Sequence, residues 1–291
     1  MVRSVHEALR KARWADSRLS RFDPLSRMIC FDDFDNGLQG WTGLIGNYEE
    51  TLDSMLPPYR DLRPPMLSAS TMWDTGSAGS WDGTYAMKLA TRSETGSMAV
   101  GLKRLTWQYQ GPIQVEAYVT FKPEASELLL SELDVRSIGV VFDLQDATRR
   151  VMPHLRYLNA LNGEQVGRWQ YKKDREPLEG IGGSGKTRSH FHLGAEGWLD
   201  LPGEPQLLCY NEIATKQNWH YMKVGFDLGT MSFTAFQFND RVYDVSQMAP
   251  MVLPAMANLW CMLNVVFWVE TDRDKRAFLY VDSVLISGEW D

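Results

Sequence analysis

A glycine-rich segment has the letters of a nucleotide-binding loop. Residues 180–187, GIGGSGKT, match the phosphate-binding pattern GxxxxGK[ST]. Phosphate binding also requires a buried strand before the loop and a helix after it, so that backbone amides and the helix N-terminus face the phosphates. A charged stretch with Pro177 precedes this loop, and Gly194 and Pro202 follow it too closely for a helix of useful length. The sequence therefore predicts a flexible loop between strands and no bound nucleotide.

Two histidines, His190 and His192, are two positions apart, so in a strand they point to the same side. There they could bind a transition metal or act as a catalytic base. With Glu196 and Gly203 they resemble the first metal-binding motif of the cupins, but the second motif does not follow where it should. We expect the pair to line a polar groove or to be solvated, with the metal site as the alternative.

A carboxylate-rich segment precedes an expected strand at 137–144. Glu132-Leu-Asp134-Val-Arg136 resembles the ExDxE strand of laminarinase-type glycoside hydrolases, where one carboxylate is the nucleophile and another the acid/base. Arg136 stands in place of the last carboxylate, and a guanidinium cannot donate a proton at neutral pH. A charged loop is therefore favoured over a retaining glycosidase site. For the alternative of a glycan-active enzyme, the remaining candidate carboxylates are Asp143, Glu164, Glu196 and Glu212.

Aromatic and hydrogen-bonding side chains are dense in the expected strands 154–160 and 166–172. Asn162-Gly163 joins these strands and is the strongest short hairpin signal. Sugars are bound by aromatic faces stacked on the CH-rich side of a pyranose, while Arg, Asn, Asp and Gln bind the hydroxyls. The sequence therefore predicts sugar binding here and at the following histidines, by Arg156, Tyr157, Asn159, Arg168, Trp169, Tyr171, His190 and His192.

The two faces of this hairpin follow from the period-two geometry of a strand. His154 and Arg156 share one face, and Tyr157 and Asn159 share the other. Both faces thus carry polar groups, which favours a hairpin that lines a ligand-facing concave surface. The alternative is a solvated outer hairpin with Trp169 or Tyr157 in the core.

The elements that must position these residues are almost all strands. About a dozen segments have the apolar alternation or the short apolar runs of strands, and turn signals separate them. Ile113–Phe121, for example, alternates cleanly. The 291 residues are enough for one large sandwich, and 44% hydrophobic residues can fill its core. The predicted fold class is all-β, with two sheets in a sandwich.

The first residues have a different pattern. Val5, Ala8, Leu9 and Ala12 recur at helical spacing, and Pro24 ends the region. We expect an N-terminal helical arm over 1–27 and a single β-sandwich domain over 28–291.

Charge and composition limit the partners and the compartment. The net charge is −7, and the basic residues are scattered beyond the N-terminus, so nucleic acid is disfavoured as a partner. No run is long enough to span a membrane. Without a signal peptide a cytoplasmic location is expected, or a secreted one if an export signal has been removed. Three widely spaced cysteines favour free thiols. The oligomeric state stays open.

Four segments, in the expected order, resemble strands of concanavalin A-like sandwiches, including carbohydrate-binding modules and laminin-G-like domains. They resemble, in turn, the opening strand, a Gly-x-Tyr-Ala strand, the paired later strands and the closing strand. The segments are 31–41 (FDDFDNGLQGW), 79–89 (GSWDGTYAMKL), 219–240 with its two aromatic strands, and 278–286 (FLYVDSVLI).

This resemblance implies a concanavalin A-like jelly roll that binds an oligo- or polysaccharide on its concave face. It also implies a structural Ca²⁺ held by Asp35, Asp82 and Asp282, since many such modules have one between the corresponding strands. The alternative for these carboxylates is a role in turns and caps. Binding without chemistry is favoured over a glycoside hydrolase or polysaccharide lyase, because no carboxylate pair stands out.

Overall fold

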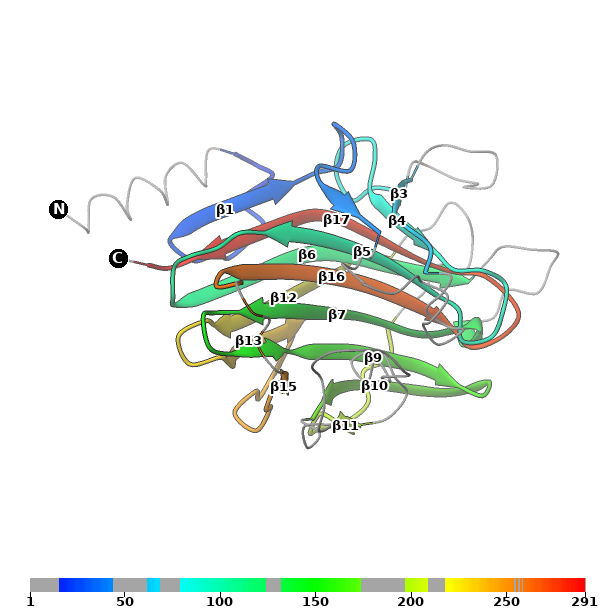
Figure 1. The fold of residues 1–291 in the computed structure, drawn as a ribbon. Helices are drawn as coiled ribbons and strands as arrows, with labels where there is room; N and C mark the ends of the chain where they lie inside the picture. The colour runs from blue at the N-terminus through cyan, green and yellow to red at the C-terminus, as the bar shows by residue number, and fades with distance from the viewer. Residues whose placement is uncertain are drawn as a thin grey trace.

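Two antiparallel β-sheets pack face to face in the computed structural model of the chain (Figure 1). The structure describes residues 16–43, 62–68, 79–123, 132–173, 197–208, 218–253, 255, 257 and 259–290. Within these ranges the one helical element is a single 3-10 turn, η2 (Glu132–Asp134). No helix in the described part of the chain is long and apolar enough to cross a membrane.

The first sheet has eight strands, and its last strand in sequence lies near its centre. β1 pairs with β17 beside the main path, so the first and last strands are neighbours. In spatial order the other strands are β14 (Arg241–Tyr243), β13 (Ser232–Phe238), β12 (His220–Asp227), β6 (Pro112–Pro123), β17 (Ala277–Gly288), β4 (Met87–Ala90) and β3 (Met66–Leu67), with β1 at Arg27–Asp32.

The second sheet has nine strands and contains the predicted hairpin. Two short strands, β8 (Arg150–Met152) and β15 (Met251–Leu253), pair with each other, and β8 also pairs with β7. The main path runs β11 (Trp198–Asp200), β10 (Glu164–Lys172), β9 (His154–Leu161), β7 (Val135–Gln145), β16 (Met262–Thr271), β5 (Met98–Leu105) and β2 (Trp41–Thr42).

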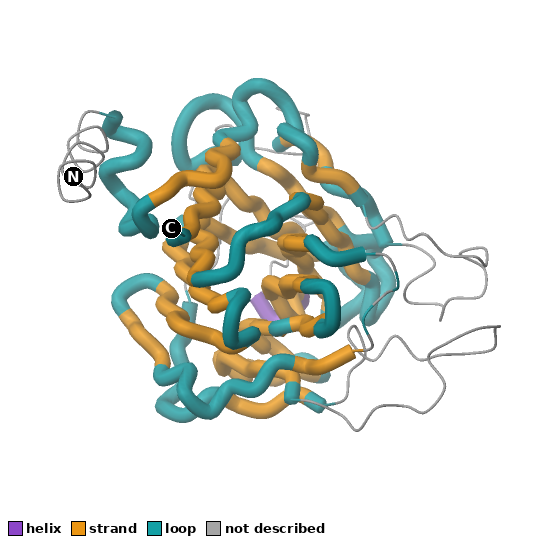
Figure 2. Tube along the Cα trace, turned by 60° about the vertical axis from the view of Figure 1, so that its left-hand side comes forward, coloured by secondary structure: helices purple, strands orange, loops and turns teal. Residues whose placement is uncertain are grey.

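The core lies between the sheets because alternate residues of each strand are apolar. β6 illustrates this: every second residue from Ile113 to Phe121 is buried in the main apolar cluster. Long strands such as β7, β16 and β17 contribute to the same cluster from both sheets. Figure 2 shows strands making up most of the described body, with loops at their ends. The predicted all-β, two-sheet sandwich is therefore confirmed.

The predicted helical arm has no support in the described residues. Residues 1–15 lie outside them, and residues 17–21 form turns. Phe22 is buried and packs its ring against Phe31 and Tyr118. β1 begins at Arg27. The stretch after residue 15 is thus a turn that leads into the first strand.

The outer face of the nine-stranded sheet has a second, smaller apolar cluster. Trp268 of β16 is 4% exposed and belongs to it, together with residues of β5, β7, β8 and β15. The indole lies over Gly139 of β7, where an added Cβ would come within 2.2 Å of the ring. The glycine at position 139 leaves room for the Trp268 ring on the outer face of the sheet.

Candidate functional site

The β9–β10 hairpin has the turn that the sequence predicts. Asn162 and Gly163 form its two-residue loop, with φ of 53° and 79°, the left-handed backbone that Asn-Gly adopts most readily. Asp272, just after β16, caps this loop. Its carboxylate accepts the N–H of Asn162 at 3.1 Å and that of Gly163 at 2.7 Å. A residue just after the end of β16, in the same sheet, thereby fixes the end of the hairpin.

Four of the predicted sugar-binding residues turn toward the core. Tyr157, Asn159 and Trp169 are 0%, 2% and 3% exposed, and Tyr171 is half-buried against the same cluster. Their polar atoms have partners: Tyr157 donates to the Gln206 carbonyl at 2.9 Å, and Trp169 Nε1 donates to Gln206 Oε1 at 3.0 Å. Asn159 donates to a backbone carbonyl of β7 at 2.8 Å. Tyr157 and Trp169 thus stabilise the sandwich and present no ring face for a sugar.

The other two, Arg156 and Arg168, lie on the outer face and belong to a polar ladder across three strands. Arg156 Nε donates to Gln170 Oε1 at 2.8 Å, and Gln170 Nε2 donates to Asp200 Oδ1 at 2.7 Å. Arg168 Nε lies 3.9 Å from Asp200 Oδ2. The ladder thus links β9, β10 and β11 and ends at the exposed edge of the sheet.

Trp198 of β11 is the aromatic residue beside this ladder. The guanidinium carbon of Arg156 lies 4.1 Å from the centre of its ring, and the Lys172 ammonium lies 4.9 Å from it. Its ring also contacts Trp268, at 6.2 Å between ring centres. The sequence prediction missed Trp198. The sequence signal for Trp198 was its alternation with Asp200 directly after Gly197. In the structure, Gly197 has a positive φ of 81°.

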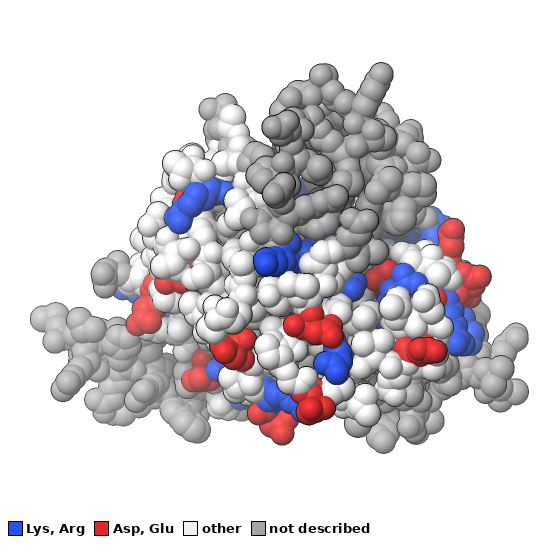
Figure 3. All heavy atoms as spheres, turned by 90° about the horizontal axis from the view of Figure 1, so that it is seen from below, with Lys and Arg blue, Asp and Glu red and all other residues white. Residues whose placement is uncertain are grey.

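The ladder changes from buried to exposed along its length. Burial lowers the pKa of Arg156 to about 10, so the guanidinium is still charged at neutral pH. At the rim, the side chains of Arg168 and Asp200 are 38% and 48% exposed. Figure 3 shows acidic and basic side chains interspersed over the described part of the side that it views. We call Arg156, Arg168, Gln170, Trp198 and Asp200 the sheet-face site.

Several predicted residues lie outside the described ranges. These are the histidines His190 and His192, the glycine-rich segment 180–187, and the carboxylates Glu196 and Glu212. Two other candidate carboxylates are described. Glu164 is exposed at the start of β10. Asp143 accepts two hydrogen bonds from Arg150, both at 2.8 Å.

Arg136 lies in the segment that resembles a glycosidase strand. Its guanidinium binds two carboxylates at the end of the neighbouring strand, β16. Its Nη1 donates to Glu270 at 3.0 Å and its Nε donates to Asp272 at 2.8 Å. Asp134 is fully buried, with Lys275 Nζ 3.3 Å from its carboxylate. The segment therefore builds a structural charge network at the end of the hairpin. No pair of carboxylates that faces a shared cleft is seen among the described residues of this network.

The three predicted calcium ligands lie around one loop, residues 80–85. Asp282 accepts the N–H groups of Trp81 at 2.6 Å and Asp82 at 3.0 Å, and Asp35 accepts that of Thr84 at 2.6 Å. The Asp82 side chain instead pairs with Arg21 at 2.9 Å. In the described ranges, no group of three His, Cys, Asp or Glu side chains is arranged to hold a metal.

Asp282 and Asp35 cap the loop from two sides. Asp282 is fully buried and has no ion pair with a basic side chain in the described chain. Burial raises its pKa to about 7, the loop N–H groups oppose this, and the charge of Asp35 adds to the rise. A Cβ on Gly83 would come within 2.0 Å of the Asp35 carboxylate. Carboxylate oxygens are the ligands that Ca²⁺ prefers, and both oxygens of Asp282 already accept backbone N–H groups, from Trp81, Asp82 and Ser283.

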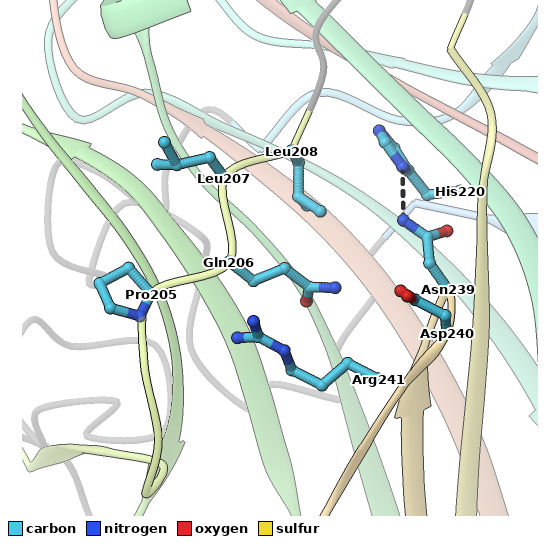
Figure 4. A pocket seen from close by; sticks show the side chains of 8 residues that line it. All are labelled: Pro205, Gln206, Leu207, Leu208, His220, Asn239, Asp240 and Arg241. Carbon is cyan, nitrogen blue, oxygen red and sulfur yellow. Dashed lines mark hydrogen bonds between the residues drawn. The ribbon is translucent and has the colours of Figure 1, made fainter.

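A pocket of about 490 Å³ lies between the chain after β11 and the β13–β14 turn (Figure 4). We call it the edge pocket. In Figure 4, the side chains of Gln206, Asp240 and Arg241 extend toward the same space, and His220 is bonded to Asn239 at its upper edge. Its lining residues are Pro205, Gln206, Leu207, Leu208, His220, Asn239, Asp240 and Arg241.

A family model described as a domain of unknown function, DUF6772, matches residues 9–290. The chain belongs to the DUF6772 family. No curated protein has a matching sequence.

Solved structures similar to this DUF6772 chain include three sandwiches. An endo-β-1,4-glucuronan lyase from Trichoderma reesei is 11% identical with a TM-score of 0.41, covering 90% of this chain and 96% of that one. A CBM22-1 xylan-binding domain from Paenibacillus barcinonensis is 12% identical, TM-score 0.33, covering 90% and 94%. A legume lectin-like domain from Entamoeba histolytica is 7% identical, TM-score 0.37, covering 70% and 84%. These likenesses are too distant to assign a ligand.

The described surface of this DUF6772 chain therefore has two sites with different chemistry. The sheet-face site combines one indole with two guanidiniums, an amide and a carboxylate on a rigid sheet. The edge pocket is open to solvent and is lined by more polar than apolar surface.

Proposed function

We propose that the chain binds an oligo- or polysaccharide at the sheet-face site, without chemistry. The observation that carries this is the position of the Trp198 ring. It is partly exposed, and it lies beside polar groups that donate and accept hydrogen bonds on the same face. An indole face with hydroxyl-binding groups around it is the chemistry that sugar binding requires.

The ladder supplies the fixed polar groups of this site. Gln170 lies between Arg156 and Asp200, so each side chain holds its neighbour in place. Groups that are already ordered lose little conformational entropy when a ligand binds. Arg168 and Asp200, at the exposed rim, are the groups that a sugar hydroxyl reaches from solvent. The ladder therefore supports recognition of a chain that runs along the sheet edge.

The ring contacts of Trp198 explain why it is placed to receive a sugar. Arg156 packs on the ring as a cation–π contact, typically about 0.5–2 kcal/mol, and holds the indole in one orientation. A fixed ring presents a flat apolar surface of the size of a pyranose. We infer that the sugar stacks on the side of the ring away from Arg156.

The test is a binding panel on the purified chain. The probes are β-1,4-linked oligomers of glucose, xylose and mannose, and oligomers of glucuronic acid, measured by isothermal titration calorimetry. We expect at least one to bind, and Trp198→Ala to weaken it by about tenfold or more, or 1.4 kcal/mol. Leu199→Ala is the matched control, because Leu199 is 41% exposed on the opposite face of the same strand.

Two results would contradict the proposal. In the first, every oligomer is left unbound. In the second, an oligomer binds equally well to the wild type and to Trp198→Ala. A parallel assay for new reducing ends and unsaturated products tests chemistry. Cleavage of a bound oligomer would make the chain a glycan-active enzyme and would overturn the statement that it only binds.

We also propose that Asp35 and Asp282 hold a structural Ca²⁺. The support is the buried carboxylate of Asp282, the nearby charge of Asp35, and their shared loop 80–85. When bound, the ion would offset the two negative charges and tie the turn after β1 to β17. It would stabilise the fold and take no part in sugar recognition.

A further inference from the structure

We propose that the edge pocket is a second binding site, for a single neutral sugar unit or a similar small polyol. The pocket is formed by two segments far apart in sequence, residues 205–208 and 239–241, together with His220. It lies at the open edge of the sandwich and shares no residue with the sheet-face site. The proposal therefore stands independently of the function proposed for that site.

The size of the pocket fits a small ligand. Its volume of about 490 Å³ is within the range of small-molecule sites, about 300–1,000 Å³. An extended polysaccharide lies along an open face, whereas a pocket of this volume, open to solvent, has room for one unit. The size thus favours a single sugar or the end of a chain.

The floor of the pocket is rigid because Gln206 is fully engaged. Its Oε1 accepts from Trp169 at 3.0 Å and from Tyr243 at 2.8 Å, and its Nε2 donates to the Phe238 carbonyl at 3.2 Å. These bonds join the chain after β11 to both sheets. A binding wall that is fixed before the ligand arrives needs no reordering on binding.

Hydrogen bonding also fixes the proton on His220. Asn239 Oδ1 accepts the N–H of Tyr221 at 3.0 Å, so the other end of this amide is the NH₂ group. That NH₂ lies 3.0 Å from His220 Nδ1 and must donate to it. Nδ1 is therefore the acceptor, and the ring proton is on Nε2. Asn239 thus holds the His220 ring in one orientation at the pocket edge.

The charges of the pocket favour a neutral ligand. Asp240 and Arg241 are adjacent and of opposite sign, and both extend into the pocket. Arg241 Nη1 donates to the Glu204 carbonyl at 2.7 Å, which fixes the guanidinium. Together the pair offers a carboxylate that accepts and N–H groups that donate, with no net charge. Neighbouring hydroxyls, each a donor and an acceptor, match this pair better than an anion or a cation does.

An apolar wall completes the match. Leu208 is 8% exposed, and its side chain reaches into the space between Gln206 and Asn239 in Figure 4. A sugar ring has CH groups on one face and hydroxyls at its edge. The leucine can contact the CH face while Asp240 and Arg241 bind the hydroxyls. The combination of wall and charge pair is specific to a small polyhydroxylated ring.

The experiment titrates the intact chain with D-glucose, D-galactose, D-mannose, L-arabinose, glycerol and D-glucuronate, by saturation-transfer NMR. We expect at least one neutral probe to bind with a dissociation constant of about 10 mM or tighter. Asp240→Ala and Arg241→Ala should each weaken it by about fivefold or more, and Trp198→Ala should change it less than about twofold. Val242→Ala is the control, since Val242 is 71% exposed beside Arg241 and does not line the pocket.

Each other outcome overturns the proposal. If no probe binds, the pocket is not a polyol site. If only glucuronate binds, the ligand is an anion and the charge argument is wrong. If binding is lost in Trp198→Ala but kept in the Asp240 and Arg241 variants, the probe sits at the sheet-face site. Melting curves of all variants establish that they are folded, and Asp240→Asn replaces Asp240→Ala if the latter is not.

Discussion

The two faces of the β9–β10 hairpin carry similar residue types and have opposite roles. On the inner face, Tyr157 and Trp169 are buried, and their polar atoms bind Gln206 inside the protein. On the outer face, Arg156 and Gln170 form a ladder that reaches solvent through Asp200. Aromatic residues on a strand with polar neighbours thus do not by themselves mark a binding surface.

The difference lies in where each polar atom finds its partner. The hydroxyl of a buried tyrosine and the N–H of a buried tryptophan each need a partner inside the protein. Gln206 provides a partner to both rings. On the outer face, the ladder residues bind one another and leave their last members at the rim. The comparison predicts stability effects from the inner face and binding effects from the outer one.

The largest effect is expected from Trp169→Ala. Truncating a buried tryptophan leaves a cavity and removes the partner of Gln206, so we expect a loss of about 3–5 kcal/mol in the free energy of unfolding. Urea denaturation followed by circular dichroism measures it. A loss below about 1 kcal/mol would mean that the inner face is not part of the core.

Calcium removal is expected to have the next effect. An ion that binds only the folded state at about 100 times its dissociation constant adds about 2.7 kcal/mol. EDTA should therefore lower the melting temperature by several degrees, and Asp282→Asn should abolish this sensitivity. A melting temperature that EDTA leaves unchanged would make Asp35 and Asp282 loop caps and nothing more.

The cap of the hairpin loop should show a smaller, pH-dependent effect. Burial tends to raise the pKa of Asp272, but hydrogen bonds from Arg136, Gly163 and Asn162 outweigh it, and the pKa is lowered. A lowered pKa stabilises the fold above the ordinary value of 3.8, and this stabilisation is lost as the pH falls through the folded-state value.

Asp272→Asn should accordingly cost about 1–3 kcal/mol at neutral pH and progressively less in acid. Urea titrations of both proteins between neutral pH and pH about 3 measure the difference. A cost that stays constant over this range would show that the charge of Asp272 does not hold the loop.

The smallest stability effect is expected from Trp198→Ala. The ring is partly exposed and loses mainly its cation–π contact with Arg156, so the cost should be about 1 kcal/mol. The same variant should lose sugar binding, which separates the outer face from the inner one. If it destabilised the chain as much as Trp169→Ala does, Trp198 would be a core residue and the comparison would fail.

The fold could be predicted from sequence because strand alternation is a local signal. The alternation of apolar residues in Ile113–Phe121 indicates which face of the strand is buried, and Asn162-Gly163 specifies the hairpin loop. The two faces of the hairpin also follow from period two. Which face meets the core depends on the other sheet, and nothing in 154–172 contains that information. For this reason the sequence pattern assigns Tyr157, Asn159 and Trp169 to a ligand-facing surface, whereas the structure buries them.

The rest of the site depends on residues distant in sequence. Trp198 and Asp200 join the ladder because β11 pairs with β10. The edge pocket requires residues 205–208 to meet the 239–241 turn, a tertiary contact without a sequence motif. Asp35 and Asp282 each lie in a segment that resembles a concanavalin A-like strand, and both accept N–H groups of the loop 80–85.

The pairing of β1 with β17 has a consequence for synthesis on the ribosome. Arg27 is opposite Gly288, so the first strand of the sheet has no partner until β17, about 250 residues later, has been made. At typical translation rates of 5–20 residues per second, β1 waits roughly ten seconds or more. The sandwich can close only after β17 has been made, and an N-terminal fragment lacking β17 leaves β1, β4 and β6 without their shared neighbour.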